Sequence, residues 1–103
     1  MPTRFQVRMT RQAQADMDDI WTFIARDNIR DANKFIQKLE SQLKTLRRLP
    51  ERCPLIPEND LLELQYRHLI YGKYRSIFRV SGKTVYVMRI VHGARLLDTS
   101  MFE

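Results

Sequence analysis

The spacing of apolar residues changes near the middle of this chain, and that change restricts the folds it can adopt. Between residues 13 and 46 the apolar residues recur every three or four positions, as on one side of an α-helix. Between residues 64 and 91 they follow the alternating pattern of β-strands. A loop is predicted at Glu51–Asp60, which contains Pro54 and Pro57, and it separates the two patterns. We therefore expect helices first and a sheet afterwards.

Two helices are predicted in the first half, each preceded by a residue that can cap its first turn. Thr10 precedes one helix, and Asn28 precedes the other with Asp31 three residues later. The second helix should end by Leu49, because Pro50 disfavours helical geometry in the residue before it. The short connection makes the pair an αα-hairpin. The stripes expected to be buried are Ala13, Met17, Ile20, Trp21 and Ile24 in the first helix, and Ala32, Phe35, Ile36, Leu39, Leu43 and Leu46 in the second.

Four strands complete the predicted fold. Their expected ranges are Arg4–Met9, Leu64–Tyr71, Tyr74–Val80 and Thr84–Val91, with a tight turn at Ser81-Gly82-Lys83. A chain of 103 residues forms one domain. The fold class is therefore α+β: an N-terminal strand, an αα-hairpin, and a three-stranded antiparallel meander. The first strand must join the meander in one sheet, because an isolated strand leaves its backbone groups unpaired.

The tight turn also suggests a register for the last two strands. The expected pairs are Val80 with Val85, Phe78 with Val87, and Ser76 with Arg89. The face expected on the helices carries Phe78, Val80, Val85, Val87 and Val91. The opposite face carries Arg75, Ile77, Arg79, Tyr86, Met88 and Ile90, and we expect it to be exposed. A mixed surface of this kind indicates contact with a partner.

The excess positive charge is concentrated in the predicted meander. The formal net charge is +6, and the stretch from Tyr66 to Arg95 holds seven Lys or Arg and no acidic residue. Before Tyr66 there are 11 basic and 10 acidic residues, so that part is nearly neutral. An acidic partner, either nucleic acid or an acidic protein segment, should be steered to the sheet.

Several other classes of protein are disfavoured. Cys53 is the single cysteine, so an internal disulfide is impossible and an incidental thiol is the simplest interpretation. Asp16, Asp18 and Asp19 do not converge on a helix, so we interpret them as a solvated face rather than a metal site. We find no cofactor motif, no metal-ligand set and no apolar run long enough to span a membrane. The N-terminal residues lack a signal-peptide core, so a cytoplasmic location is expected.

The order of these segments resembles a known family of bacterial toxins. The two helices and the exit Leu46…Leu49-Pro50 are similar to the ParE/RelE superfamily. The segments 67–69, 71–80 and 91–95 (RHL, YGKYRSIFRV and VHGAR) resemble its ParE, or plasmid-stabilisation, branch in particular. The resemblance extends from Phe5 to Arg95. It implies the toxin of a type II toxin–antitoxin module, neutralised by an antitoxin partner that also carries the contact with operator DNA.

The family implies two competing targets. ParE-like members resemble non-enzymatic poisons of DNA gyrase, whereas RelE-like members are metal-independent endoribonucleases that cleave mRNA, often on the ribosome. RelE-like nucleases commonly carry a His or Tyr near the C-terminus, and residues 96–103 here contain neither. This departure favours the gyrase interpretation. A degenerate toxin that only binds its antitoxin is a third alternative.

Two sets of candidate site residues follow from these alternatives. His92 suits acid–base chemistry, but in the His-Gly-Ala-Arg segment a structural role is the alternative. We expect His68 to serve packing or a partner surface, and most of the tyrosines to pack. The candidates for contact with the target or its phosphates are Arg67, Lys73, Arg75, Arg79, Arg89 and Arg95. The candidates for a nuclease are His92, Arg75, Arg79 and Arg89.

Overall fold

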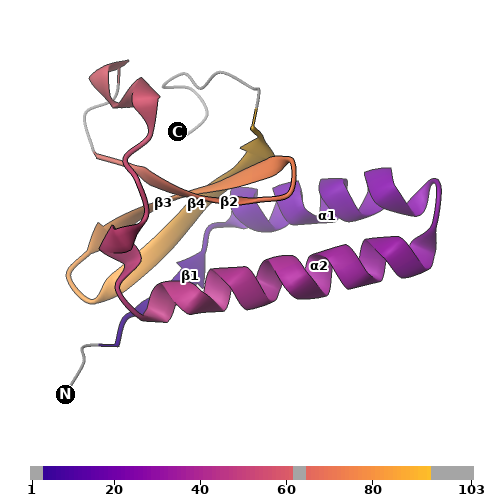
Figure 1. Cartoon of the computed structure of the whole chain (residues 1–103), viewed down its shortest axis with the longest axis horizontal. Coiled ribbons are helices and arrows are strands. Elements are labelled where there is room, and N and C mark those ends of the chain that lie inside the picture. Colours follow the sequence, from indigo (N-terminus) through magenta and orange to yellow (C-terminus); the bar gives the residue numbers. More distant parts are fainter. Residues whose placement is uncertain (1–3, 62–64, 94–103) are drawn as a thin grey trace.

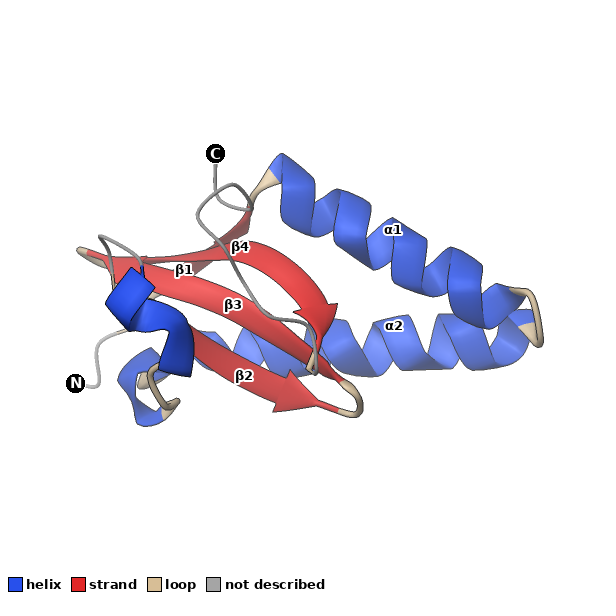
Figure 2. Ribbon diagram, turned by 90° about the horizontal axis from the view of Figure 1, so that it is seen from above, coloured by secondary structure: helices blue, strands red, loops and turns tan. Residues whose placement is uncertain are grey.

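Two helices cover one face of a four-stranded sheet in the computed structural model, which describes residues 4–61 and 65–93 (Figure 1). The helical hairpin extends past the end of the sheet, as Figure 2 shows from above. The elements are β1 (Gln6–Met9), α1 (Arg11–Ala25), α2 (Ile29–Lys44), β2 (Arg67–Tyr71), β3 (Tyr74–Ser81) and β4 (Thr84–His92), with short 3₁₀ helices at Thr45–Arg47, Pro50–Arg52 and Pro57–Leu61. The predicted α+β fold and its element order are confirmed.

Both predicted helix caps are present. The Thr10 hydroxyl accepts a hydrogen bond from the Ala13 backbone N–H at 3.1 Å. The Asn28 side-chain oxygen accepts one from the Asp31 N–H at 3.1 Å. These contacts satisfy N–H groups that have no partner inside the first turn of a helix. None of the described helices is long and apolar enough to cross a membrane.

The sheet has the strand order β1-β4-β3-β2, so the N-terminal strand lies beside the last strand. Strand β1 runs parallel to β4, and the other neighbours are antiparallel. The prediction that the first strand joins the meander is therefore correct. The arrangement leaves β3 in the interior of the sheet and β2 at one edge.

A β-bulge in β4 changes the predicted register partway along the hairpin. The pairs Val80–Val85 and Phe78–Val87 form as predicted, but the register shifts between Ile77 and Phe78. Ser76 therefore lies opposite Ile90 rather than Arg89. An extra residue in one strand reverses which face the following side chains occupy. The predictions that Val91 packs on the helices and that Ile90 lies on the opposite face are consequently wrong.

The main core lies between the helices and the sheet. Its buried members include Ala13, Ile20, Leu39, Leu43, Leu46, Phe78, Val85, Val87 and Ile90. Leu39 and Phe78 are almost completely buried, at 1% and 0% exposed. The predicted apolar stripes of both helices therefore contribute buried residues to this core, Ala13 and Ile20 from α1 and Leu39 and Leu43 from α2. Trp21 lies at the helix–helix contact, where its indole N–H donates to the Asn33 side chain at 2.8 Å.

A second, smaller cluster covers the other face of the sheet, which the sequence analysis predicted to be exposed. Ile56 and Tyr66 from the connecting segment pack there on Ile77 and Val91. Ile77 is completely buried as a result. The segment after α2 thus folds back over β3, and much of the outer face is protein interior. That part of the prediction is wrong, because a connection that appeared to be a surface loop supplies apolar cover.

Candidate functional site

Arg75 is buried, although the sequence analysis placed it on an exposed face. Its side chain is 6% exposed and forms an ion pair with Glu58, whose side chain is 9% exposed. Both terminal nitrogens of Arg75 donate to the Glu58 carboxylate, Nη1 to Oε1 at 3.0 Å and Nη2 to Oε2. A two-pronged contact of this kind fixes the guanidinium plane. Arg75 therefore fastens the segment after α2 to β3.

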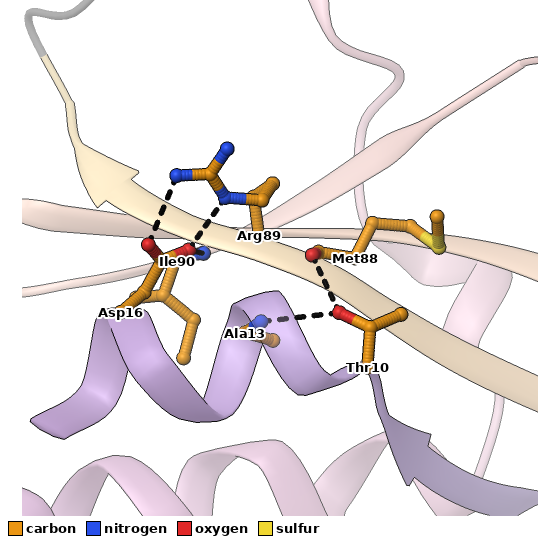
Figure 3. Close-up of polar contacts among 6 residues, drawn as sticks. All are labelled: Thr10, Ala13, Asp16, Met88, Arg89 and Ile90. Atoms are coloured by element: carbon orange, nitrogen blue, oxygen red, sulfur yellow. Dashed lines mark hydrogen bonds and ion pairs between the residues drawn. The ribbon is translucent and has the colours of Figure 1, made fainter. Parts of the chain in front are cut away.

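Arg89 is also held by a carboxylate, this time from α1 (Figure 3). Its Nε donates to Asp16 at 2.8 Å and its Nη2 donates at 3.0 Å. The same carboxylate accepts a hydrogen bond from the Ile90 backbone N–H at 2.9 Å. These hydrogen bonds raise the pKa of Arg89, although partial burial opposes them. The prediction that Asp16 belongs to a solvated face is wrong, whereas Asp18 and Asp19 are exposed as expected.

The Asp16 contact protects an edge of the sheet. Strand β1 pairs with β4 only as far as Met9 and Val87. Beyond that point Thr10 continues the contact, since its hydroxyl donates to the Met88 carbonyl at 2.8 Å (Figure 3). Asp16 then satisfies the next free N–H of β4. The start of α1 thus replaces β1 where that strand ends, and an open strand edge is avoided.

Arg67 holds the loop after α2 rather than projecting freely. Its Nη1 donates to the carbonyl oxygens of Cys53 at 2.6 Å and Glu51 at 3.1 Å. Burial raises the pKa of the Cys53 thiol, and the nearby charges of Arg52 and Arg67 oppose that effect. A buried thiol with a raised pKa is a weak nucleophile. The sequence interpretation of Cys53 as an incidental thiol is consistent with this environment.

Two further candidates remain accessible on the sheet. The guanidinium carbon of Arg79 lies 4.8 Å from the centre of the Tyr86 ring, and both side chains are half-buried. This cation–π contact keeps the Arg79 charge at the surface. Lys73 is exposed in the turn between β2 and β3. The last candidate, Arg95, lies outside the described residues.

The two histidines occupy different environments. His68 in β2 is half-buried, and its Nδ1 lies 3.5 Å from Nη1 of Arg75. Burial lowers the pKa of His68, Arg75 lowers it further, and Glu58 opposes both. His92 is exposed at the end of β4, where its ring meets Tyr74 edge-on at 5.8 Å.

The four nuclease candidates are not brought together. His92 pairs with Tyr74 at one end of the hairpin, and Arg79 pairs with Tyr86 toward the other. Tyr74 and Arg79 are five residues apart on β3, or about 16 Å along a strand. Arg75 and Arg89 are held by Glu58 and Asp16 respectively. Neither ion pair can be read from the sequence pattern, because the carboxylate partner of each arginine is distant along the chain.

A helical hairpin packed on a four-stranded sheet, in this element order, is the fold that the ParE/RelE resemblance implies. The sequence matches the family described as "ParE toxin of type II toxin-antitoxin system, parDE" over residues 7–97. The chain therefore belongs to the ParE toxin family and is the toxin component of a type II toxin–antitoxin system.

Individual relatives agree with this assignment. The chain is 29% identical over 86 residues to Toxin ParE1 of Caulobacter vibrioides, an alignment covering 82% of this chain and 85% of that protein. Among solved structures, the chromosomal ParDE system from P. aeruginosa superimposes with a TM-score of 0.69 at 23% identity, over 87% of this chain and 97% of that one. The RelBE2 complex of Mycobacterium tuberculosis gives 0.58 at 24% identity, over 86% and 98%. These two structural similarities establish the shared fold.

Proposed function

We propose that this toxin arrests growth by binding DNA gyrase in the cytoplasm and that it performs no chemistry of its own. The observation that carries the proposal is the use of the candidate nuclease arginines as structural links. Arg75 and Arg89 are committed to carboxylates, and Arg79 lies far along the hairpin from His92. General acid–base cleavage of RNA needs an acid, a base and cations positioned around one phosphate. The four candidates named for a nuclease, His92, Arg75, Arg79 and Arg89, do not form such a group.

We further propose that an antitoxin neutralises the toxin by adding a strand to the open edge of β2. Ile56 and Pro54 cover the start of that edge through hydrogen bonds with Tyr66 and His68. Ile70 is the next residue whose backbone groups point outward, and its side chain is 64% exposed. An extended partner segment can pair with such an edge, and its side chains then give specificity. Operator DNA would be contacted through the antitoxin.

The test is induced expression in cells, with DNA damage and mRNA integrity followed in parallel. A gyrase poison should cause filamentation, a DNA damage response and double-strand breaks that depend on gyrase, while transcripts stay intact. The His92→Ala variant should be as toxic as the wild type, because His92 has no catalytic role in this proposal.

Two outcomes would overturn the proposed target. Rapid transcript cleavage without DNA breaks, lost in His92→Ala, would establish a RelE-like endoribonuclease. Absence of growth inhibition in every host, with antitoxin binding retained, would establish a degenerate toxin. A supercoiling assay with purified gyrase and purified toxin then separates direct inhibition from a secondary response in cells.

A further inference from the structure

A concave basic surface lies at the C-terminal end of α2, separate from the sheet arginines. This open concavity has a volume of about 550 Å³. Its cationic lining, called the basic pocket below, consists of Arg4, Lys44, Arg47, Arg48 and Arg52. None of the described residues that line it is acidic. The charge count along the chain points to the meander, whereas these five cations come together only in the fold.

Three chain segments meet to form the basic pocket. Lys44, Arg47 and Arg48 follow one another at helical spacing where α2 passes into a 3₁₀ turn. The Phe5 N–H donates to the Arg47 carbonyl at 2.8 Å, which places the preceding residue, Arg4, beside them. The backbone then reverses at Leu49, whose φ is 47°, and returns Arg52 to the helix end. The pocket is therefore a product of the fold rather than of one helix.

Arg52 has a structural role that the other four cations do not share. Its Nη1 donates to the carbonyls of Arg48 at 2.8 Å and Leu49 at 3.2 Å, and its Nη2 donates to the Thr45 hydroxyl at 2.8 Å. It thereby satisfies carbonyl groups that a helix leaves free at its C-terminus.

The remaining four side chains are exposed and have no structural assignment. Arg4, Lys44, Arg47 and Arg48 form no ion pair or side-chain hydrogen bond with another described residue. Residues three and four apart on a helix are neighbours, so their like charges repel one another. This contrasts with Arg75 and Arg89, whose charges are balanced by carboxylates. A bound anion would relieve the repulsion in the basic pocket.

We propose that the basic pocket binds the phosphate groups of a nucleic-acid backbone, without regard to sequence. The arginine guanidinium matches the geometry of a phosphate and can donate two hydrogen bonds to it. A nucleic-acid strand carries a negative charge at every nucleotide, so a few consecutive phosphates can meet four clustered cations. Contacts between these cations and phosphate groups carry no sequence information by themselves.

This inference goes beyond the proposed function, because it concerns a ligand of the toxin chain itself and holds for either target. It also differs from operator recognition, which the proposed function gives to the antitoxin. The toxin would contact nucleic acid through the helix end, while the edge of β2 remains available to the antitoxin.

The test compares two triple variants that remove the same charge. The pocket variant carries Lys44→Gln, Arg47→Gln and Arg48→Gln. The matched control carries Arg26→Gln, Arg30→Gln and Lys34→Gln, three exposed residues at the opposite end of the helical hairpin. Fluorescence anisotropy with a short labelled DNA duplex of arbitrary sequence, and with a single strand, is measured across a series of salt concentrations. Melting curves verify that both variants are folded.

The pocket variant should lose at least roughly tenfold in affinity at low salt, and its dependence of log affinity on log salt should become shallower by about 2 to 3 for duplex DNA. The control should change affinity by less than about threefold, because its side chains lie outside the contact. Equal losses in the two variants, or no binding by the wild type at low salt, would overturn the proposal. Poly-glutamate serves as a second probe in the same assay. If the pocket variant keeps its affinity for the duplex but loses its affinity for poly-glutamate, the pocket binds an acidic protein segment and the proposal is overturned.

Discussion

Replacing Asp16 with alanine tests the contact that joins α1 to the free edge of β4. The carboxylate accepts three hydrogen bonds, two from Arg89 and one from the Ile90 N–H, at 2.8 to 3.0 Å. Asp16→Ala leaves a guanidinium and a backbone N–H without this partner. The Asp16 and Arg89 side chains are 13% and 17% exposed, so water can only partly replace the lost contacts.

The expected cost follows from that geometry. A fully buried pair that loses one partner costs about 3–5 kcal/mol, and an exposed pair costs about 1 kcal/mol or less. This pair lies between those limits, so we expect a loss of about 2–3 kcal/mol in the free energy of unfolding. For a domain of this size that corresponds to a melting temperature lower by roughly 8–15 °C. Denaturant titration and thermal melting both measure it.

A matched control is available on the same helix. Asp19 carries the same charge but is exposed, so Asp19→Ala should change stability by about 0.5 kcal/mol or less. In the Arg89→Met background, Asp16→Ala should cost much less than in the wild type, because its charged partner has gone. Equal effects of Asp16→Ala and Asp19→Ala would refute the reasoning. The reasoning would also be refuted if the losses in unfolding free energy caused by Asp16→Ala and Arg89→Met were additive in the double variant.

Two further predictions concern β2. The pKa of His68 is lowered in the folded protein, so the unfolded chain binds more protons at mildly acidic pH. The free energy of unfolding should therefore fall as the pH drops below the usual histidine pKa. The His68→Gln variant should show a smaller fall in denaturant titrations at several pH values. A pH dependence unchanged in His68→Gln would assign it to other groups. Ile70→Asp should weaken antitoxin binding at least tenfold, as measured by calorimetry. Its melting temperature should stay near that of the wild type, because the Ile70 side chain is 64% exposed. Unchanged affinity would place the antitoxin elsewhere.

The sequence was informative where a local signal specifies a local structure. Thr10 and Asn28 cap the helices as predicted, and the stripe that includes Leu39 and Leu43 is buried. Helical periodicity and capping depend on residues within one turn, so a single sequence contains them. The tight turn at Gly82 likewise fixed the nearest strand pairs, Val80 with Val85 among them.

The outer face of the sheet could not be predicted in the same way. Its cover comes from Ile56, which lies in a segment with no periodic pattern, and from Tyr66, which was expected inside the strand Leu64–Tyr71. The bulge beside Ile77 then moved Ile90 onto the helix side and Val91 off it. One inserted residue reverses all the faces that follow, and nothing in the alternation of the strand marks where the insertion falls.

The sequence by itself determined the number and order of the α-helices and strands, the helix caps and the family. Only the tertiary structure decided which positive charges are available to a partner. Arg75 and Arg89 are paired with carboxylates 17 and 73 residues away, whereas Lys44 and Arg48 at the end of α2 remain exposed beside Arg4. The charge of a side chain is set by the residue type. Whether an opposite charge neutralises it depends on the groups that folding brings within a few ångströms. The exposed charge therefore lies partly at the helix end, where the sequence pattern did not place it.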